Sequence, residues 1–147
     1  MIVIDTDVLA IYHLFTHDLR YDVTETFMKS SSHQPRSTTL YNLMELAGII
    51  SSSGKTAAAK TIIETYARAR DMKILYPSLS LKTPEHFWVE YCAQLMEVME
   101  RGLRYGDAKI LWVAESNECN VLVTWNTSHY GKKTRMEVMT PEEFCSP

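Results

Sequence analysis

The chain has 147 residues, of which 46% are hydrophobic and 22% charged, and its formal net charge is −3. That length suits one domain with a sizeable core. No apolar run approaches the roughly 20 residues that cross a bilayer, and the N-terminus does not resemble a signal peptide. The cysteines at 92, 119 and 145 are too far apart for a disulfide framework or a Cys-x-x-Cys metal site. We therefore expect a single domain over residues 1–147, cytoplasmic and without a membrane partner.

The charge balance also limits how the protein can contact nucleic acids. A protein that binds them through bulk charge is strongly basic, and this chain is mildly acidic. Any such contact must be local. It requires either a basic rim or metal ions that reverse the sign of an acidic pocket.

The first half of the chain predicts alternating strands and helices. Ile2-Val3-Ile4 is a β-branched run without polar alternation, which indicates a strand buried on both faces. Asp7 suits the N-cap of a helix that continues to Phe15. A short helix within 21–33 follows. Apolar spacing then predicts a strand at 37–39, helices over 40–50 and 57–70, and a strand at 73–76.

The second half contains the best-marked helix. Thr83-Pro84-Glu85 supplies an N-cap, a proline at the first helical position and an acid at the positive end of the dipole. Gly102 is a suitable stop. A further helix is predicted from about Asp107 to 117, with strands at 121–124 and 137–139.

Strands separated mostly by helices indicate an α/β sandwich with a mostly parallel sheet. In such sheets, ligand sites lie outside the carboxyl ends of the strands. That rule directs attention to Asp5, at the end of the first strand, and to the residues that follow Thr124.

Four oxygen-bearing side chains occupy positions that suit such a site. Each has an ordinary interpretation, as a turn residue, a solvated helix acid or a helix-start acid. Together they predict a set of oxygen ligands for a hard cation such as Mg²⁺ or Mn²⁺. His13 and His17 lack a third ligand nearby in sequence, so we expect them to be exposed. The four candidates are Asp5, Glu45, Asp107 and Asn126.

These residues lie in four segments that resemble the PIN-domain ribonucleases, in particular the VapC toxin subunits of toxin–antitoxin pairs. Val3 to Leu9 resembles the first motif, an apolar strand followed by Asp-Thr-x-Val-Leu. Ser37 to Leu46 resembles the second, a strand leading into a helix that carries an acid. Tyr105 to Ala114 resembles the third, and Val121 to Asn126 with His129-Tyr130 resembles the fourth. The four occur in order and cover nearly the whole chain.

The resemblance implies a three-layer α/β/α sandwich with a central sheet of four or five strands. It also implies a metal-dependent ribonuclease that hydrolyses RNA phosphodiesters and leaves 3′-hydroxyl and 5′-phosphate ends. Many members carry Asp where this chain has Asn126, which leaves open whether one or two Mg²⁺ (or Mn²⁺) ions bind. Asn126 would contact metal, water or phosphate, and Thr6 and Thr124 would support the pocket. The implied metal ligands are Asp5, Asp107 and Glu45.

The implied partners are an RNA substrate, a second copy of the chain and a cognate antitoxin. An antitoxin Arg or Lys would pair with the carboxylates and displace the metal. Without metal the acidic site repels RNA, so basic side chains must assist. We expect Lys132, Lys133 and Arg135 near the mouth of the site. Weaker candidates are Arg36, Arg104 and Lys109.

Two other functions fit parts of the pattern. Asp5-x-Asp7 after an apolar strand resembles the opening of haloacid-dehalogenase-type phosphatases, but Leu9 and Leu111 stand where that pattern requires other residues. The other alternative is a PIN-like scaffold that binds RNA or a partner without cutting, a role that Asn126 would suit. Metal-dependent cleavage of RNA distinguishes this scaffold from the nuclease.

Overall fold

The computed structural model of the chain describes residues 1–79 and 83–146. Within them, five strands form one sheet in the order β3-β2-β1-β4-β5, and every neighbouring pair is parallel. Because parallel neighbours cannot be joined by a tight hairpin, longer connections carry the chain back to the start of each strand. The strands are β1 (Ile2–Ile4), β2 (Arg36–Thr39), β3 (Lys73–Leu75), β4 (Val121–Val123) and β5 (Glu137–Met139).

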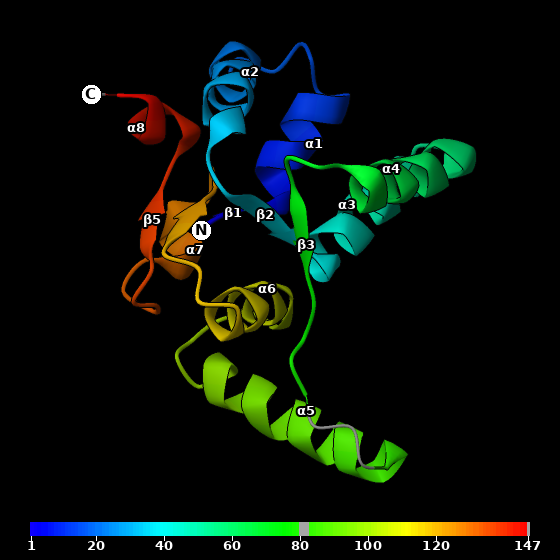
Figure 1. The fold of residues 1–147 in the computed structure, drawn as a ribbon, viewed down its shortest axis with the longest axis vertical. Coiled ribbons are helices and arrows are strands. Elements are labelled where there is room, and N and C mark those ends of the chain that lie inside the picture. The colour runs from blue at the N-terminus through cyan, green and yellow to red at the C-terminus, as the bar shows by residue number, and fades with distance from the viewer. Residues whose placement is uncertain (80–82, 147) are drawn as a thin grey trace.

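Helices cover both faces of this sheet (Figure 1). Side chains of α1 to α4 and α8 share one hydrophobic core with the sheet, and those of α5, α6 and α7 share the other. The predicted three-layer α/β/α sandwich is therefore confirmed. None of the helices among the described residues is both long and apolar enough to cross a bilayer. They are α1 (Thr6–Leu14), α2 (Tyr21–Ser30), the 3₁₀ turn η1 (Ser31–His33), α3 (Leu40–Ser52), α4 (Thr56–Arg68), α5 (Pro84–Met99), α6 (Tyr105–Ser116), α7 (Thr127–Tyr130) and α8 (Pro141–Cys145).

The central strand β1 shows why its apolar run has no polar alternation. Side chains alternate across a strand, and here both faces are covered. Ile2 and Ile4 pack into the core with α1 to α4, and Val3 packs into the core with α5 and α6. All three side chains are buried, so β1 holds the two cores together.

Two predicted helix starts were wrong by a few residues. Asp5, not Asp7, is the N-cap of α1, because its side chain accepts a hydrogen bond from the Thr6 backbone N–H. Asp7 lies in the first turn of the helix. Helix α6 begins at Tyr105, two residues before the approximate predicted start, and Asp107 is an acid of its first turn, one of the two roles that the sequence suggested.

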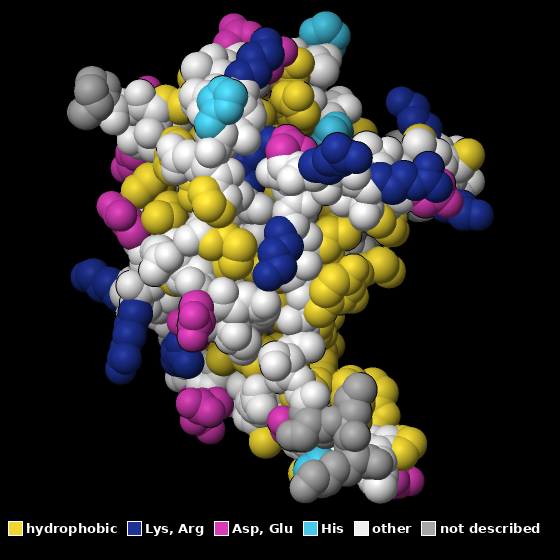
Figure 2. Space-filling model, in the orientation of Figure 1, with side chains coloured by type: hydrophobic (Ala, Val, Ile, Leu, Met, Phe, Trp, Pro, Cys, Tyr) yellow, Lys and Arg dark blue, Asp and Glu magenta, His cyan; other side chains and the backbone are white. Residues whose placement is uncertain are grey.

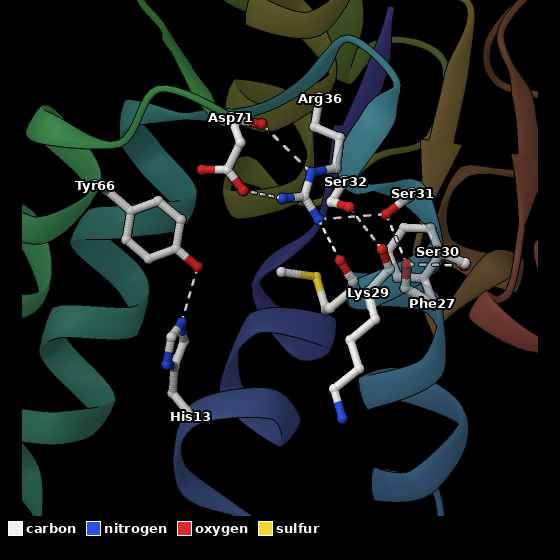
Figure 3. A network of polar contacts seen from close by, with 10 residues as sticks. His13, Phe27, Lys29, Ser30, Ser31, Ser32, Arg36, Tyr66 and Asp71 are labelled. Atoms are coloured by element: carbon white, nitrogen blue, oxygen red, sulfur yellow. Dashed lines mark hydrogen bonds and ion pairs between the residues drawn. The ribbon is translucent and has the colours of Figure 1, made fainter.

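The amino edge of the sheet contains a buried cation. The Arg36 side chain, at the start of β2, is only 4% exposed and forms an ion pair with Asp71. Its Nη1 donates to the Met28 carbonyl oxygen at 2.6 Å, and its Nε donates to the Asp71 carbonyl oxygen at 3.4 Å (Figure 3). These bonds tie the end of α2 to the segment before β3. The prediction that Arg36 contacts substrate was therefore wrong, because its guanidinium is committed to the protein interior.

Candidate active site

The carboxyl ends of β1, β2 and β4 meet at one edge of the sheet, because these strands are parallel neighbours. Asp5 follows β1 directly, and its side chain is buried at this edge. Its Oδ1 accepts hydrogen bonds from the Thr6 backbone N–H at 2.8 Å and from Asn42 Nδ2 at 2.9 Å. These two donors hold the carboxylate in one orientation.

Asn42 is held by a capping box at the start of α3. Its Oδ1 accepts from the Thr39 backbone N–H at 3.1 Å and from Thr39 Oγ1 at 2.6 Å. The oxygen is thereby occupied, and the amide nitrogen is left to donate to Asp5 and to Thr6 Oγ1. Sequence reasoning missed Asn42. The signal was available as Thr39-x-x-Asn42 at the end of a predicted strand.

Glu45 lies one turn beyond Asn42 on α3 and is exposed. Its Oε2 accepts a hydrogen bond from Thr6 Oγ1 at 2.6 Å. Thr6 therefore accepts from Asn42 and donates to Glu45, which links the acid of α3 to the residue that follows Asp5. The structure brings together Asp5, Thr6 and Glu45, as the sequence analysis expected.

Asp7 also belongs to this edge, although the sequence predicted it only as a helix cap or as part of the Asp5-x-Asp7 pattern of phosphatases. Its Oδ2 accepts from Thr124 Oγ1 at 3.1 Å and from the Trp125 backbone N–H at 3.0 Å. Its Oδ1 is buried and, among the described residues, has no hydrogen-bond partner. Burying a carboxylate oxygen without a partner costs free energy. This oxygen is a free acceptor for a cation or water, and the Asp5-x-Asp7 spacing at a strand end was its sequence signal.

Asp107 approaches the same edge from the first turn of α6. Its Oδ2 lies 3.3 Å from His129 Nδ1 on α7. The next residue, Tyr130, is fully buried. Burial raises the pKa of its hydroxyl, and the negative charges of three surrounding carboxylates raise that pKa further. These carboxylates are those of Asp5, Asp107 and Asp7.

The carboxylates at this edge destabilise one another's charged forms. Burial raises the pKa of Asp5 to about 7, and the charges of Asp7 and Glu45 add to the effect. Hydrogen bonds from Thr124 and Thr6 oppose the rise. Burial also raises the pKa of Asp7. A cation bound here would stabilise the ionised forms.

The donor set at this edge suits a hard cation. Every candidate ligand is an oxygen, and one of them, Asp7 Oδ1, is buried and unused. Within residues 1–79 and 83–146, no three acidic, histidine or cysteine side chains lie close enough together to hold a metal by themselves. Mg²⁺ in proteins usually keeps several waters and uses only one or two carboxylates. The residues therefore fit Mg²⁺ or Mn²⁺ with part of its shell supplied by water or phosphate.

Three further predicted residues, Asn126, Lys109 and Arg104, lie in α6 or at the starts of α6 and α7. Asn126 is exposed at the start of α7, and its backbone N–H donates to Thr124 Oγ1 at 3.0 Å. Lys109 Nζ lies over the rings of Tyr41 and Tyr105, 4.9 and 4.4 Å from their centroids. Arg104 is exposed at the N-cap of α6.

The basic trio Lys132, Lys133 and Arg135 lies elsewhere. These residues line a cavity with Asn120 and Met136, which directly precede β4 and β5. They therefore border the amino edge of the sheet, opposite Asp5. Their expected position at the mouth of the acidic site was wrong, because the loop after α7 returns to the start of β5.

Comparison with known proteins identifies the fold. No family model and no curated protein matched the sequence. A toxin–antitoxin complex from Klebsiella pneumoniae superposes with a TM-score of 0.64 at 17% identity, covering 96% of this chain and 98% of that chain. VapBC2 from Rickettsia felis, bound to a promoter DNA fragment, gives a TM-score of 0.64 at 16% identity, covering 95% and 98%. The chain has the fold of VapC-type PIN domains.

A third structure matches the chain over a smaller share of its length. It is VapC20 of Mycobacterium tuberculosis, described as a sarcin–ricin loop cleaving toxin, with a TM-score of 0.57 at 13% identity. The match covers 83% of this chain and 87% of that chain. Identities this low establish the fold alone, and the chemistry must be argued from the residues of this chain.

Proposed function

We propose that this PIN domain is a divalent-metal-dependent endoribonuclease and the toxin of a type II toxin–antitoxin pair. The observation that carries the proposal is the convergence of Asp5, Asp7, Glu45 and Asp107 at the carboxyl edge of the sheet. Buried acids without an internal cation are costly to the fold, which favours a ligand-binding role. The toxins among the structural neighbours support the same activity.

Asp5 and Asp107 would be metal ligands, Glu45 would bind directly or through a water, and Asp7 Oδ1 would be a further acceptor. Water would complete the shell, because no three acidic, histidine or cysteine side chains among the described residues lie close enough to hold the ion by themselves. When bound, Mg²⁺ or Mn²⁺ supplies Lewis acidity that lowers the pKa of a water and relieves phosphate charge. The chain's own residues provide the orientation. Asn42 and the Thr6 backbone N–H fix Asp5, while the Thr6 hydroxyl fixes Glu45.

The residues after β4 complete the pocket. Thr124 Oγ1 and the Trp125 N–H hold Oδ2 of Asp7, which leaves its Oδ1 directed away from these donors. His129 Nδ1 lies 3.3 Å from Asp107 Oδ2, where it would help to orient that carboxylate. Asn126, on the exposed rim, would contact the metal, its water or the scissile phosphate.

Two protein partners belong to this proposal. An antitoxin segment would place an Arg or Lys against the four carboxylates, where a charge-assisted hydrogen bond is strong. A second copy would cover the apolar side chains that line the concave side of the molecule between α3, α4 and α5 (Figure 2). Large apolar side chains are exposed on two of these helices, among them Met44 on α3 and Trp88 and Met96 on α5. Sedimentation of the isolated chain tests the dimer, which a purely monomeric species would exclude.

Cleavage of single-stranded RNA after chelation and metal return tests the enzyme. Mg²⁺ and Mn²⁺ should restore activity and Zn²⁺ should not, because Zn²⁺ sites usually recruit His or Cys. Asp5→Asn and Asp107→Asn should each lower the rate by at least about 100-fold, since even residues that only orient ligands account for 10–100-fold. Glu45→Gln should have a smaller effect, because Glu45 is exposed.

Asp22→Asn is the matched control, because Asp22 is an exposed acid in the first turn of α2. It should cleave at the native rate, and thermal melts should show all variants folded. A folded native protein that cleaves no RNA with any of these metals would favour the non-catalytic scaffold. Greater activity with Zn²⁺ than with Mn²⁺ would contradict the all-oxygen site.

A further inference from the structure

A cavity of about 750 Å³ lies at the amino edge of the sheet, beside the starts of β4 and β5. Figure 2 shows Lys and Arg side chains gathered around the loop that joins α7 to β5. Of the described residues, four basic and one acidic line this cavity, although the whole chain carries a net negative charge. The charged lining residues are Arg101, Lys132, Lys133, Arg135 and Glu115.

The single acid does not neutralise the cavity. Glu115 Oε2 pairs with Arg101 Nη1 at 2.8 Å, and Glu115 Oε1 accepts from Thr134 Oγ1 at 2.7 Å. Among the described residues, Lys132 and Arg135 take part in no ion pair, and both are exposed. Two positive charges are therefore available to an anion from outside the chain.

The loop that carries these charges is held in place. Lys133 Nζ donates to the Gly102 and His129 carbonyl oxygens at 3.0 and 2.8 Å, and Arg101 Nη1 donates to the Lys133 carbonyl oxygen at 3.4 Å. Lys132 adopts a φ of +64°, a left-handed conformation that is uncommon for a non-glycine residue. The Lys133 side chain therefore holds the loop in place, while the side chains of Lys132 and Arg135 remain exposed.

The cavity is connected to the acidic edge through α7. His129 lies against Asp107 at one edge, and its carbonyl oxygen accepts from Lys133 on the cavity side. Strands of three residues are about 10 Å long, so a few nucleotides of single-stranded RNA span the distance between the edges. An inorganic anion would occupy only a small part of the cavity.

We propose that this basic cavity binds the phosphodiester backbone of the RNA a few nucleotides from the scissile bond. The inference rests on the proposed function, because it makes the cavity a second contact for the same substrate. Lys132 and Arg135 supply the contacts, and Glu118 and Glu137 on adjoining positions keep the basic surface small. Binding is then local and strongly salt-dependent, as a protein of net charge −3 requires.

The test measures binding of a fluorescently labelled 12-nucleotide single-stranded RNA by anisotropy, in chelator and at several salt concentrations. The variant is Lys132→Gly with Arg135→Gln, because glycine accepts a φ of +64° without strain. Loss of two phosphate contacts should lower the slope of log K against log salt by about 1.4 and weaken binding by about 25-fold at 0.1 M salt.

The control is Lys60→Gln with Arg70→Gln, an equal charge change at exposed positions in or just after α4. It should bind as the native chain does. An unchanged slope and affinity in the cavity variant would overturn the proposal, as would a loss seen with duplex DNA and not with RNA. Because binding is read without cleavage, a chain that binds RNA through this cavity but never cuts it would refute the enzyme proposal and leave the cavity assignment standing.

Discussion

The two edges of the sheet treat buried charge in opposite ways. At the amino edge, Arg36 is buried and its guanidinium is bonded to Asp71 and to backbone carbonyl groups. At the carboxyl edge, Asp5 and Asp7 are placed beside other acids, and Asp7 Oδ1 has no partner among the described residues. A buried charge whose hydrogen bonds are all made within the chain positions chain segments. A buried charge that lacks a partner favours binding of a ligand from outside the chain.

The same contrast separates stability from function. The Arg36 network joins α2, β2 and the segment before β3, so its loss should affect folding. The acidic edge stores unfavourable electrostatic energy, so its neutralisation should stabilise the metal-free protein while removing activity.

The largest expected effect is the pH dependence of stability in chelator. The pKa of Asp5 is raised from 3.8 to about 7 in the folded protein. The folded state therefore binds the Asp5 proton more tightly than the unfolded state does. The free energy of unfolding that this proton contributes is present below about pH 4 and is lost as pH rises from about 4 to about 7. Asp5→Asn should remove this loss and be more stable than the native chain at pH 8, by up to about 4 kcal/mol.

Urea unfolding at pH 5 and pH 8 measures this difference. Saturating Mg²⁺ should narrow the gap between the two proteins at pH 8, because the ion stabilises ionised Asp5 only in the native chain. If the free energy of unfolding fell by the same amount in both proteins between pH 5 and pH 8, ionisation of Asp5 would not destabilise the fold, and the prediction would be wrong.

The second prediction concerns the amino edge. Asp71→Asn removes the charged partner of buried Arg36 and should destabilise the fold by about 1–3 kcal/mol. Asp18→Asn is the matched control, because it breaks an Asp–Arg pair in which the Arg20 side chain is 47% exposed. It should cost at most about 1 kcal/mol. RNA cleavage by Asp71→Asn at a temperature where it is folded should equal that of the native chain, and a loss of activity there would contradict the separation of the two edges.

The smallest expected effect is that of Asn126→Asp. An added carboxylate at the start of α7 should raise affinity for Mg²⁺, but by no more than about tenfold, because Asn126 is exposed and its charge is screened. The metal-free protein should be slightly less stable, through repulsion from the neighbouring acids. Calorimetric titration measures the affinity, with Asn120→Asp at the amino edge as the control. Equal affinities for Asn126→Asp and the native chain would place Asn126 outside the metal pocket.

The sequence predicted the layers of the fold better than the details of the site. The apolar run Ile2-Val3-Ile4 and the Thr83-Pro84 helix start are local signals, and both were confirmed. Asn42 and Asp7 were missed as site residues, because each has an ordinary local role as a cap or first-turn residue. Their second role depends on partners more than 30 positions away in the chain.

The Lys132 to Arg135 segment shows the same limit at longer range. Its charge is visible in the sequence, but the edge of the sheet on which it lies depends on how far the loop after α7 travels before β5 begins. Hydrophobic periodicity and helix capping act over a few residues, so the sequence alone determined the positions of the five strands, the main helices between them and the α/β class. Strand order and helix packing bring distant residues together, so only the tertiary structure decided which acids converge, which cation is buried and which basic residues form a separate cavity.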